Sequence, residues 1–181
     1  MKTIYLICGR TATGKSSIAK KVCSDLGMVL LKSYATRPMR PGEEIESDHI
    51  FIKPEDVETY KNDIAAYTKI GDYEYFTTYE RLKNCDLYVI DPDGIQSLLD
   101  KCGDMFDFVV VYIRSPKREL MERAQQRGDD AEKFQTRMEA EDERFTRFEK
   151  ARLWDYHILN DTTLESAVEK LKKIIRKEQF S

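Results

Sequence analysis

The first segment that could carry out chemistry is a glycine-rich run near the N-terminus, residues 9–16, which matches the pattern G-x4-G-K-[ST]. Glycines allow a tight backbone path that turns successive N–H groups toward one anion. A helix that follows adds its partial positive charge, the lysine can bridge terminal phosphates, and the serine hydroxyl can coordinate Mg2+. The sequence therefore predicts a nucleoside triphosphate site made of Gly9, Arg10, Thr11, Ala12, Thr13, Gly14, Lys15, Ser16 and Ser17.

A second basic feature lies in a loop that contains two prolines. Arg37 and Arg40 are three residues apart in this loop. Because guanidinium groups match phosphate oxygens bidentately, two of them can converge on one anion and form a second phosphate site. The alternative is a solvated basic loop, whose charge is offset by Glu43, Glu44 and Glu46.

From this loop onward the sequence resembles the guanylate kinase family, in which S-x-T-T-R-x-P-R-x-G-E-x-x-G-x-D-Y-x-F follows a phosphate loop at the same distance. Three later segments are similar to the family's I-D-x-x-G, R-L-x-x-R-G and I-V-N-D elements, namely 90–94, 123–128 and 157–161. The resemblance thus covers roughly the whole chain. The gap-free matches to the long motif are Ser33, Thr36, Arg37, Arg40, Gly42, Glu43, Asp48 and Phe51.

This resemblance implies an α/β protein with the P-loop three-layer fold: a parallel sheet core, a small monophosphate-binding insertion and a helical lid. It implies transfer of the γ-phosphoryl group of ATP to GMP, giving GDP, with Mg2+. Lys15 and Ser16 are expected to hold ATP and its metal, Asn160 to lie near the adenine, and Asp91 to contact the acceptor base or the metal. The acceptor-site residues that it implies are Ser33, Arg37, Arg40, Glu43, His49, Thr68, Tyr75, Thr77 and Asp91.

Three further arginines are expected to neutralise charge at the transferring phosphoryl group. Arg123 and Arg127 are four residues apart, on one face of an expected helix, and Arg137 belongs to the next helix. The alternative is that they form ion pairs with neighbouring glutamates along an exposed helix pair. The expected catalytic set is Lys15, Arg37, Arg40, Arg123, Arg127 and Arg137.

The acceptor side departs from the family pattern in three places. His49 stands where the family has a tyrosine that helps to hold the acceptor phosphate, and its ring can still donate a hydrogen bond. Thr68 stands where the family has the glutamate that reads guanine, and a hydroxyl lacks that bidentate acceptor face. Phe76 replaces a glycine after an inserted Glu74. Asp72 or Glu74 is a hypothetical replacement for the lost carboxylate.

Apolar runs and helical periodicity alternate along the chain, which is typical of a parallel sheet covered on both faces. Strands are predicted at 3–8, 28–31, 86–90, 106–113 and 156–159, and helices at 15–26, 93–99, 117–127, 131–152 and 164–178. A short helix at 55–64 and alternating segments around 67–76 indicate a small insertion. We interpret 1–181 as one domain, with a core at 1–32 and 80–181, an acceptor-binding subdomain at about 33–79 and a lid at about 117–150.

Length and composition fit one folded domain: 181 residues, 41% hydrophobic and 35% charged, with a net charge of -3. Apolar runs fall far short of the roughly 20 residues of a membrane span, and no signal peptide is evident, so we expect a cytoplasmic location and no membrane partner. The small net charge argues against nucleic-acid binding, which leaves small-molecule nucleotides as expected partners and the oligomeric state open. Four separated cysteines indicate free thiols rather than a zinc or redox site.

Two other functions are compatible with these features. The departures on the acceptor side suggest a kinase of the same fold that acts on another phosphorylated acceptor, such as a ribose phosphate. A guanylate-kinase-like binding module without catalysis is the other alternative, and the complete phosphate loop argues against it.

Overall fold

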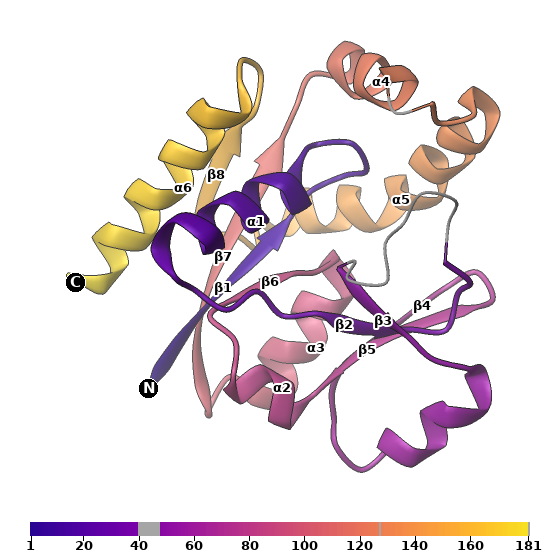
Figure 1. Cartoon of the computed structure of the whole chain (residues 1–181), viewed down its shortest axis with the longest axis vertical. Coiled ribbons are helices and arrows are strands. Elements are labelled where there is room, and N and C mark those ends of the chain that lie inside the picture. Colours follow the sequence, from indigo (N-terminus) through magenta and orange to yellow (C-terminus); the bar gives the residue numbers. More distant parts are fainter. Residues whose placement is uncertain (40–47, 127, 181) are drawn as a thin grey trace.

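The computed structural model describes residues 1–39, 48–126 and 128–180, and within them two four-stranded sheets form. The first sheet has the strand order β6-β1-β7-β8, and every neighbouring pair is parallel (Figure 1). Its strands are β1 (Lys2–Cys8), β6 (Leu87–Val89), β7 (Phe106–Arg114) and β8 (Tyr156–Leu159). The helices are α1 (Lys15–Leu26), α2 (Tyr79–Lys83), α3 (Pro92–Cys102), α4 (Lys117–Gln126), α5 (Ala131–Ala151), α6 (Leu164–Gln179) and the 3-10 helix η1 (Pro54–Tyr60).

Alternate residues of β1 face opposite sides of this sheet, as the two-residue period of a strand requires. Tyr5 and Ile7 belong to a buried cluster with side chains of α1 and α6. Ile4 and Leu6 belong to a second cluster with side chains of α3 and α5. Helices therefore cover both faces of the sheet (Figure 1), which confirms the predicted three-layer α/β fold.

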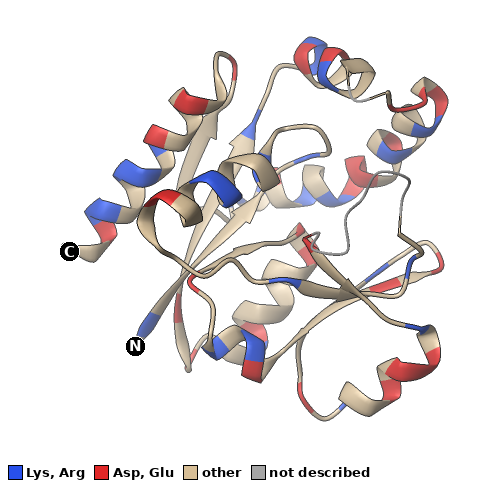
Figure 2. Cartoon of the chain, in the orientation of Figure 1, with Lys and Arg blue, Asp and Glu red and all other residues tan. Residues whose placement is uncertain are grey.

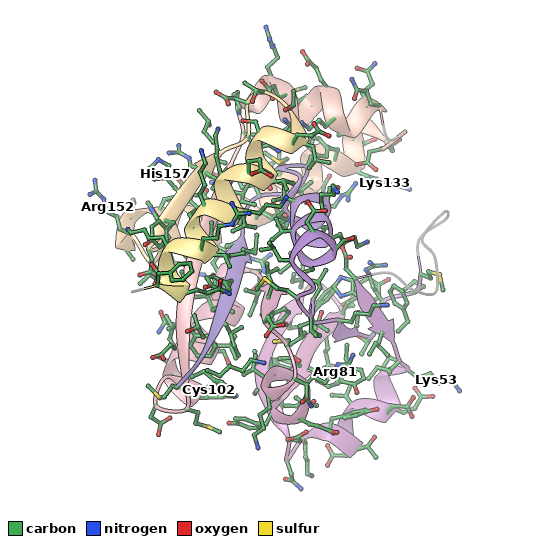
Figure 3. All side chains as sticks on the ribbon, turned by 60° about the vertical axis from the view of Figure 1, so that its left-hand side comes forward. Lys53, Arg81, Cys102, Lys133, Arg152 and His157 are labelled. Carbon is green, nitrogen blue, oxygen red and sulfur yellow. The ribbon has the colours of Figure 1, made fainter. Side chains whose placement is uncertain are left out.

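The second sheet has the strand order β3-β2-β5-β4 and lies beside the first. Its strands β2 and β3 are parallel, whereas β5 pairs antiparallel with both β2 and β4. Arg81 of α2, labelled in Figure 3, donates its Nε–H to Lys32 O (3.0 Å) and lies 5.3 Å from the centre of the Tyr34 ring. This contact joins α2 to the start of the sheet. The four strands are β2 (Ser33–Ala35), β3 (His49–Phe51), β4 (Ile64–Ile70) and β5 (Tyr73–Thr78).

Helix α5 crosses the molecule. Lys133 near its start and Arg152 at its C-cap lie on opposite sides in Figure 3, consistent with a length of about 30 Å for 21 residues. Phe134 packs in a small buried cluster with α4 and the phosphate loop. Phe148 packs at the other end of α5, with its ring 5.3 Å from that of Tyr112 on β7. The helix is thus anchored at both ends.

One predicted strand is wrong, and one helix and the strands β2 and β3, which begin and end a segment expected to be a loop, were missed. Residues 28–31 form only an isolated bridge, between Leu30 and Leu87, because the Asp86 carboxylate accepts the N–H of Val29 (2.8 Å) where a strand carbonyl would otherwise do so. The missed helix is α2, and the predicted helix at 55–64 is the 3-10 helix η1. All four cysteines are buried and free. No helix in the described part of the chain is long and apolar enough to cross a membrane.

Candidate active site

The path of the phosphate loop is fixed by close packing. A Cβ atom on Gly9 would lie 2.6 Å from Ile113 O, and one on Gly14 would lie 2.9 Å from Asn160 Nδ2. Gly14 also has φ +84°, in the left-handed region. Ala12 adopts φ 63°, a conformation that costs a residue with a Cβ about 1–2 kcal/mol. The loop therefore holds a strained backbone between β1 and α1, as an anion-binding loop does.

The loop is held by a hydrogen bond from Asn160, the residue after β8, and by hydrogen bonds between its own residues. Asn160 Nδ2 donates to Thr13 O (2.9 Å), Thr13 Oγ1 donates to Arg10 O (2.8 Å), and Lys15 Nζ donates to Arg10 O (3.2 Å). Asn160 is 4% exposed, and in this structure its buried side chain holds the loop through the hydrogen bond to Thr13 O. Its predicted contact with the adenine stays a prediction. Because Gly14 has no side chain, nothing at the N-cap position competes for the first N–H groups of α1.

Both predicted anion sites open onto one cavity of about 430 Å³. The phosphate loop lines it with Gly9, Thr11, Ala12, Lys15 and Ser16, and the second sheet and its flanking loops line it with Ser33, Arg37, His49, Thr68 and Tyr75. Asp91 and Arg137 line it as well. Two further predicted donor residues, Arg10 and Thr13, line a second cavity of about 450 Å³, together with Arg114 and Ser115 of the segment that ends β7. Ser17 is exposed on α1.

The predicted acceptor-phosphate side is built on β2 and β3. Arg37 is 6% exposed, its guanidinium lies 4.9 Å from the centre of the Phe51 ring, and Nη1 donates to the carbonyl of the next residue. Strand pairing places Ser33 opposite His49, and Ser33 Oγ and His49 Nδ1 are 2.9 Å apart. The His49 ring lies edge-on to that of Tyr75, with 5.6 Å between centres. Arg40 and Glu43 lie outside the described residues.

Asp91 follows β6, caps α3 and lines the cavity. Because Asp91 is predicted to contact the acceptor base, we call this part of the cavity the base end. Its Oδ1 accepts the N–H of Gly94 (2.7 Å) and the hydroxyl of Thr68 (3.1 Å). Arg144 Nη1 lies 3.9 Å from its Oδ2. Burial raises the pKa of Asp91, and the hydrogen bonds from Gly94 and Thr68 offset only part of this rise. Thr68 and Asp91, predicted from separate motifs, are therefore one hydrogen-bonded pair.

The hypothesis that Asp72 or Glu74 replaces the missing guanine-reading carboxylate stays a prediction. Thr68 pairs with Tyr75 across β4 and β5, and both residues line the cavity. Glu74 pairs with Lys69, and its neighbour Tyr67 also lines the cavity. Glu74 accepts a hydrogen bond from Tyr67 (2.6 Å), which raises the pKa of Tyr67 to about 12. Thr77 is completely buried, and its predicted contact with substrate stays a prediction.

The predicted lid arginines have different surroundings. Arg123 donates to Ser115 Oγ (3.0 Å) and Asn160 O (3.1 Å), and to Thr13 O of the phosphate loop (3.5 Å). It also forms the alternative ion pair along its helix, with Glu119 Oε2 (2.9 Å). Arg137 lines the main cavity, and its Nη2 lies 3.5 Å from Asp129. Arg127 lies outside the described residues. The structure therefore places Arg137 on the wall of the cavity that both predicted anion sites share.

The oxygen groups near Ser16 fit Mg2+, provided that a phosphate supplies further ligands. Asp48 forms a hydrogen bond with Ser16 and an ion pair with Lys20 (2.8 Å). Burial opposes ionisation of Asp48, but these partners lower its pKa overall. In the described ranges, no group of three or more His, Cys, Asp or Glu side chains could hold a metal ion unaided. Mg2+ commonly takes few protein ligands and completes its shell with phosphates and water.

Sequence reasoning missed two charged residues of the cavity, Glu141 and Arg144. Glu141 accepts two hydrogen bonds from Thr11 in the phosphate loop, and Arg144 lies beside Asp91. Their spacing from Arg137, four and seven residues, places all three on one stripe of α5. Charged residues of both signs occur along the whole of α5 (Figure 2), so this stripe does not stand out in the sequence.

The raised pKa of Asp91 predicts a pH-dependent stability difference for Asp91→Asn, which keeps an acceptor for Gly94 and Thr68. The native state retains the Asp91 proton at pH values where the unfolded state, with a pKa near 3.8, has lost it. Ionised Asp91 therefore lowers stability as pH rises through this window. In urea denaturation, the free energy of unfolding of the variant minus that of the wild type should increase from about pH 3.8 upward and level off above the native pKa. A difference that decreases over this range would contradict the assignment.

Comparisons with known proteins show the family of this chain. The family model for guanylate kinase matches residues 1–178. A guanylate kinase of Novosphingobium aromaticivorans is 30% identical over 188 aligned residues, covering 98% of this chain and 82% of the relative. One of Lactiplantibacillus plantarum is also 30% identical, covering 98% and 89%. The crystal structure of guanylate kinase from Anaplasma phagocytophilum has the same fold, with a TM-score of 0.75, 22% identity, and coverage of 99% of this chain and 87% of that one. The chain belongs to the guanylate kinase family.

Proposed function

We propose that this chain transfers the γ-phosphoryl group of ATP to GMP, with Mg2+ bound to the triphosphate. The observation that carries the proposal is the single cavity that the phosphate loop shares with Arg37, His49 and Asp91. Two anionic substrates bound at its two sides would place their phosphates in the same space. Family membership adds the same expectation, because the relatives are named guanylate kinases.

The donor side supplies groups suited to a triphosphate. The backbone of the loop and the N-terminus of α1 offer N–H groups to the phosphates, and Lys15 lies where it can contact the terminal ones. Ser16 and Asp48 supply oxygen atoms suited to Mg2+, directly or through water. The metal would neutralise charge between the terminal phosphates.

Transfer itself needs position and charge compensation rather than a covalent enzyme intermediate. Arg37 would bind the acceptor phosphate bidentately, with its guanidinium held against the Phe51 ring. Arg137 lies in the same cavity and would contact the phosphoryl group between donor and acceptor. Closure of α4 over the site would exclude water, to which the phosphoryl group would otherwise be lost.

The base end favours guanine over adenine. Because Thr68 donates its proton to Asp91, its oxygen retains lone pairs that would accept from a bound base, as would Oδ2 of Asp91. Guanine offers N1–H and N2–H groups to such acceptors, and its O6 can accept from a cation such as Arg144, 3.9 Å from Asp91. Adenine has an acceptor at N1, which would face these oxygens unfavourably. The pair of Thr68 and Asp91 thus takes the role that the resemblance gives to a glutamate.

This proposal is tested by measuring ADP formation with ATP against a panel of acceptors. The panel contains GMP, dGMP, IMP, AMP, CMP, UMP and ribose 5-phosphate. GMP should give the highest kcat/KM, with AMP lower by about 100-fold or more, because an acceptor base of the wrong pattern leaves buried polar groups unpaired. IMP lacks the 2-amino group and should fall between them. Turnover of another acceptor with none for any guanine nucleotide would reject GMP in favour of that acceptor.

Two substitutions should separate the donor and acceptor sites. Lys15→Ala should lower kcat about 100- to 1,000-fold, because it removes a preorganised charge from the transferring phosphate. Arg37→Ala should raise KM for GMP about 10-fold or more and leave KM for ATP unchanged, because it removes a charged hydrogen-bonding partner. Lys21→Ala is the control: it lies on the same helix as Lys15, 54% exposed and paired with Asp25, and should leave both constants unchanged. An effect of Arg37→Ala on KM for ATP alone would contradict the assignment of the two sites.

A further inference from the structure

Helix α5 contacts the phosphate loop through Glu141, a residue that no motif singles out. Its Oε2 accepts the backbone N–H of Thr11 at 2.8 Å, and its Oε1 accepts the hydroxyl of Thr11 at 2.9 Å. Both carboxylate oxygens are therefore engaged by one residue of the loop. A two-point hydrogen bond of this kind fixes orientation as well as distance.

The neighbouring loop residue, Arg10, contacts the same helix. Its Nη1 lies 2.9 Å from Asp142, its Nε lies 4.0 Å from Glu149, and its guanidinium is 5.0 Å from the centre of the Phe145 ring. Contacts with α5 thus extend over two successive loop residues and over more than two turns of the helix. The phosphate loop and α5 are joined as one unit in this structure.

Glu141 lies between two arginines of the main cavity on the same stripe of α5. Arg137, one turn before it, lines the cavity onto which the phosphate loop and the predicted acceptor site open. Arg144, nearly one turn after it, contacts the carboxylates of Asp91 and Asp93, each at 3.9 Å. One face of α5 therefore contacts the phosphate loop through Glu141, lines the cavity with Arg137 and contacts Asp91 through Arg144. Any shift of α5 against the loop would move Arg137 relative to the donor phosphates.

We propose that Glu141 is a positioning residue for phosphoryl transfer: its two hydrogen bonds to Thr11 hold Arg137 in register with the phosphate loop. The inference rests on the proposed function, because it assigns Arg137 to the transferring phosphoryl group. Misplacement of a catalytic group by about 1 Å can cost about 100-fold in rate, so a small slip of α5 would be visible in kcat.

A rival explanation is that the Glu141 carboxylate mimics a phosphate and blocks the loop until ATP displaces it. The two explanations predict opposite effects for the removal of the side chain. Loss of a positioning contact lowers kcat, whereas loss of a blocking anion lowers KM for ATP and raises kcat/KM.

The test compares Glu141→Gln with Glu141→Ala. Glutamine retains both hydrogen bonds without the charge, because its carbonyl oxygen can accept from Thr11 N–H and its NH2 group can donate to the Thr11 hydroxyl oxygen. Alanine removes both. Glu143→Ala is the matched control, since Glu143 lies two residues along the same helix, is 85% exposed, and forms a long ion pair of 4.0 Å with Arg147.

At saturating ATP and acceptor, Glu141→Ala should lower kcat about 10- to 100-fold with KM for the acceptor little changed. Glu141→Gln should keep most of the wild-type kcat, and Glu143→Ala all of it. Amide hydrogen exchange without nucleotide gives a second readout. Exchange across residues 9–14 should rise in Glu141→Ala and stay near the wild-type rate in the other two variants.

Three results would overturn the proposal. The first is a wild-type kcat in Glu141→Ala, and the second is a Glu141→Gln variant as slow as Glu141→Ala, since charge would then matter rather than the hydrogen bonds. The third is a lower KM for ATP and a higher kcat/KM in both variants, which supports the blocking explanation. Turnover is measured with the best acceptor of the wild-type chain. The role of Glu141 is thus tested even if that acceptor is not GMP. If the wild-type chain transfers phosphate to no acceptor, both the proposed function and the positioning role of Glu141 are overturned.

Discussion

Two phosphate groups that both carry negative charge must approach within about 3–3.5 Å for transfer to occur, and their mutual repulsion is the constraint on which this architecture depends. Positive groups have to surround the meeting point without neutralising one another. In this chain they come from separate elements: the loop after β1, the segment after β2, and α5. No single helix, strand or loop can supply the donors for both phosphate groups, because each anion needs its own set of donors facing it. The fold is a means of bringing these sets to one cavity.

The parallel sheet makes this convergence possible. The carboxyl ends of β1 and β6 lie side by side, so the phosphate loop and Asp91 follow neighbouring strands and open onto the same cavity. The second sheet adds the acceptor side as a separate layer, with Ser33, His49 and Tyr75 close together on it. Helix α5 then connects the two sides, through Glu141 at the loop and Arg144 at Asp91. Alignment of the substrates is therefore a property of tertiary packing as much as of the motifs.

The features that could be predicted from the sequence are those encoded by neighbouring residues. The phosphate loop, α1 and β8 were predicted closely, because glycine spacing, helical period and apolar runs act locally. The strand at 28–31 failed for a nonlocal reason: a side chain from residue 86 takes the Val29 N–H. Glu141 and Arg144 were missed because, on a helix rich in both charges, they resemble solvated ion-pairing residues. Only the packing of α5 against the loop and α3 distinguishes them from exposed neighbours such as Glu143.

The claim that one cavity holds two anions at once is tested most directly by calorimetric titration of GMP into the chain saturated with a non-hydrolysable ATP analogue and Mg2+. The account predicts that one GMP binds per chain while the analogue remains bound. If the analogue abolishes GMP binding by competition, the two phosphate sites are one site. Direct transfer between bound substrates would then be contradicted.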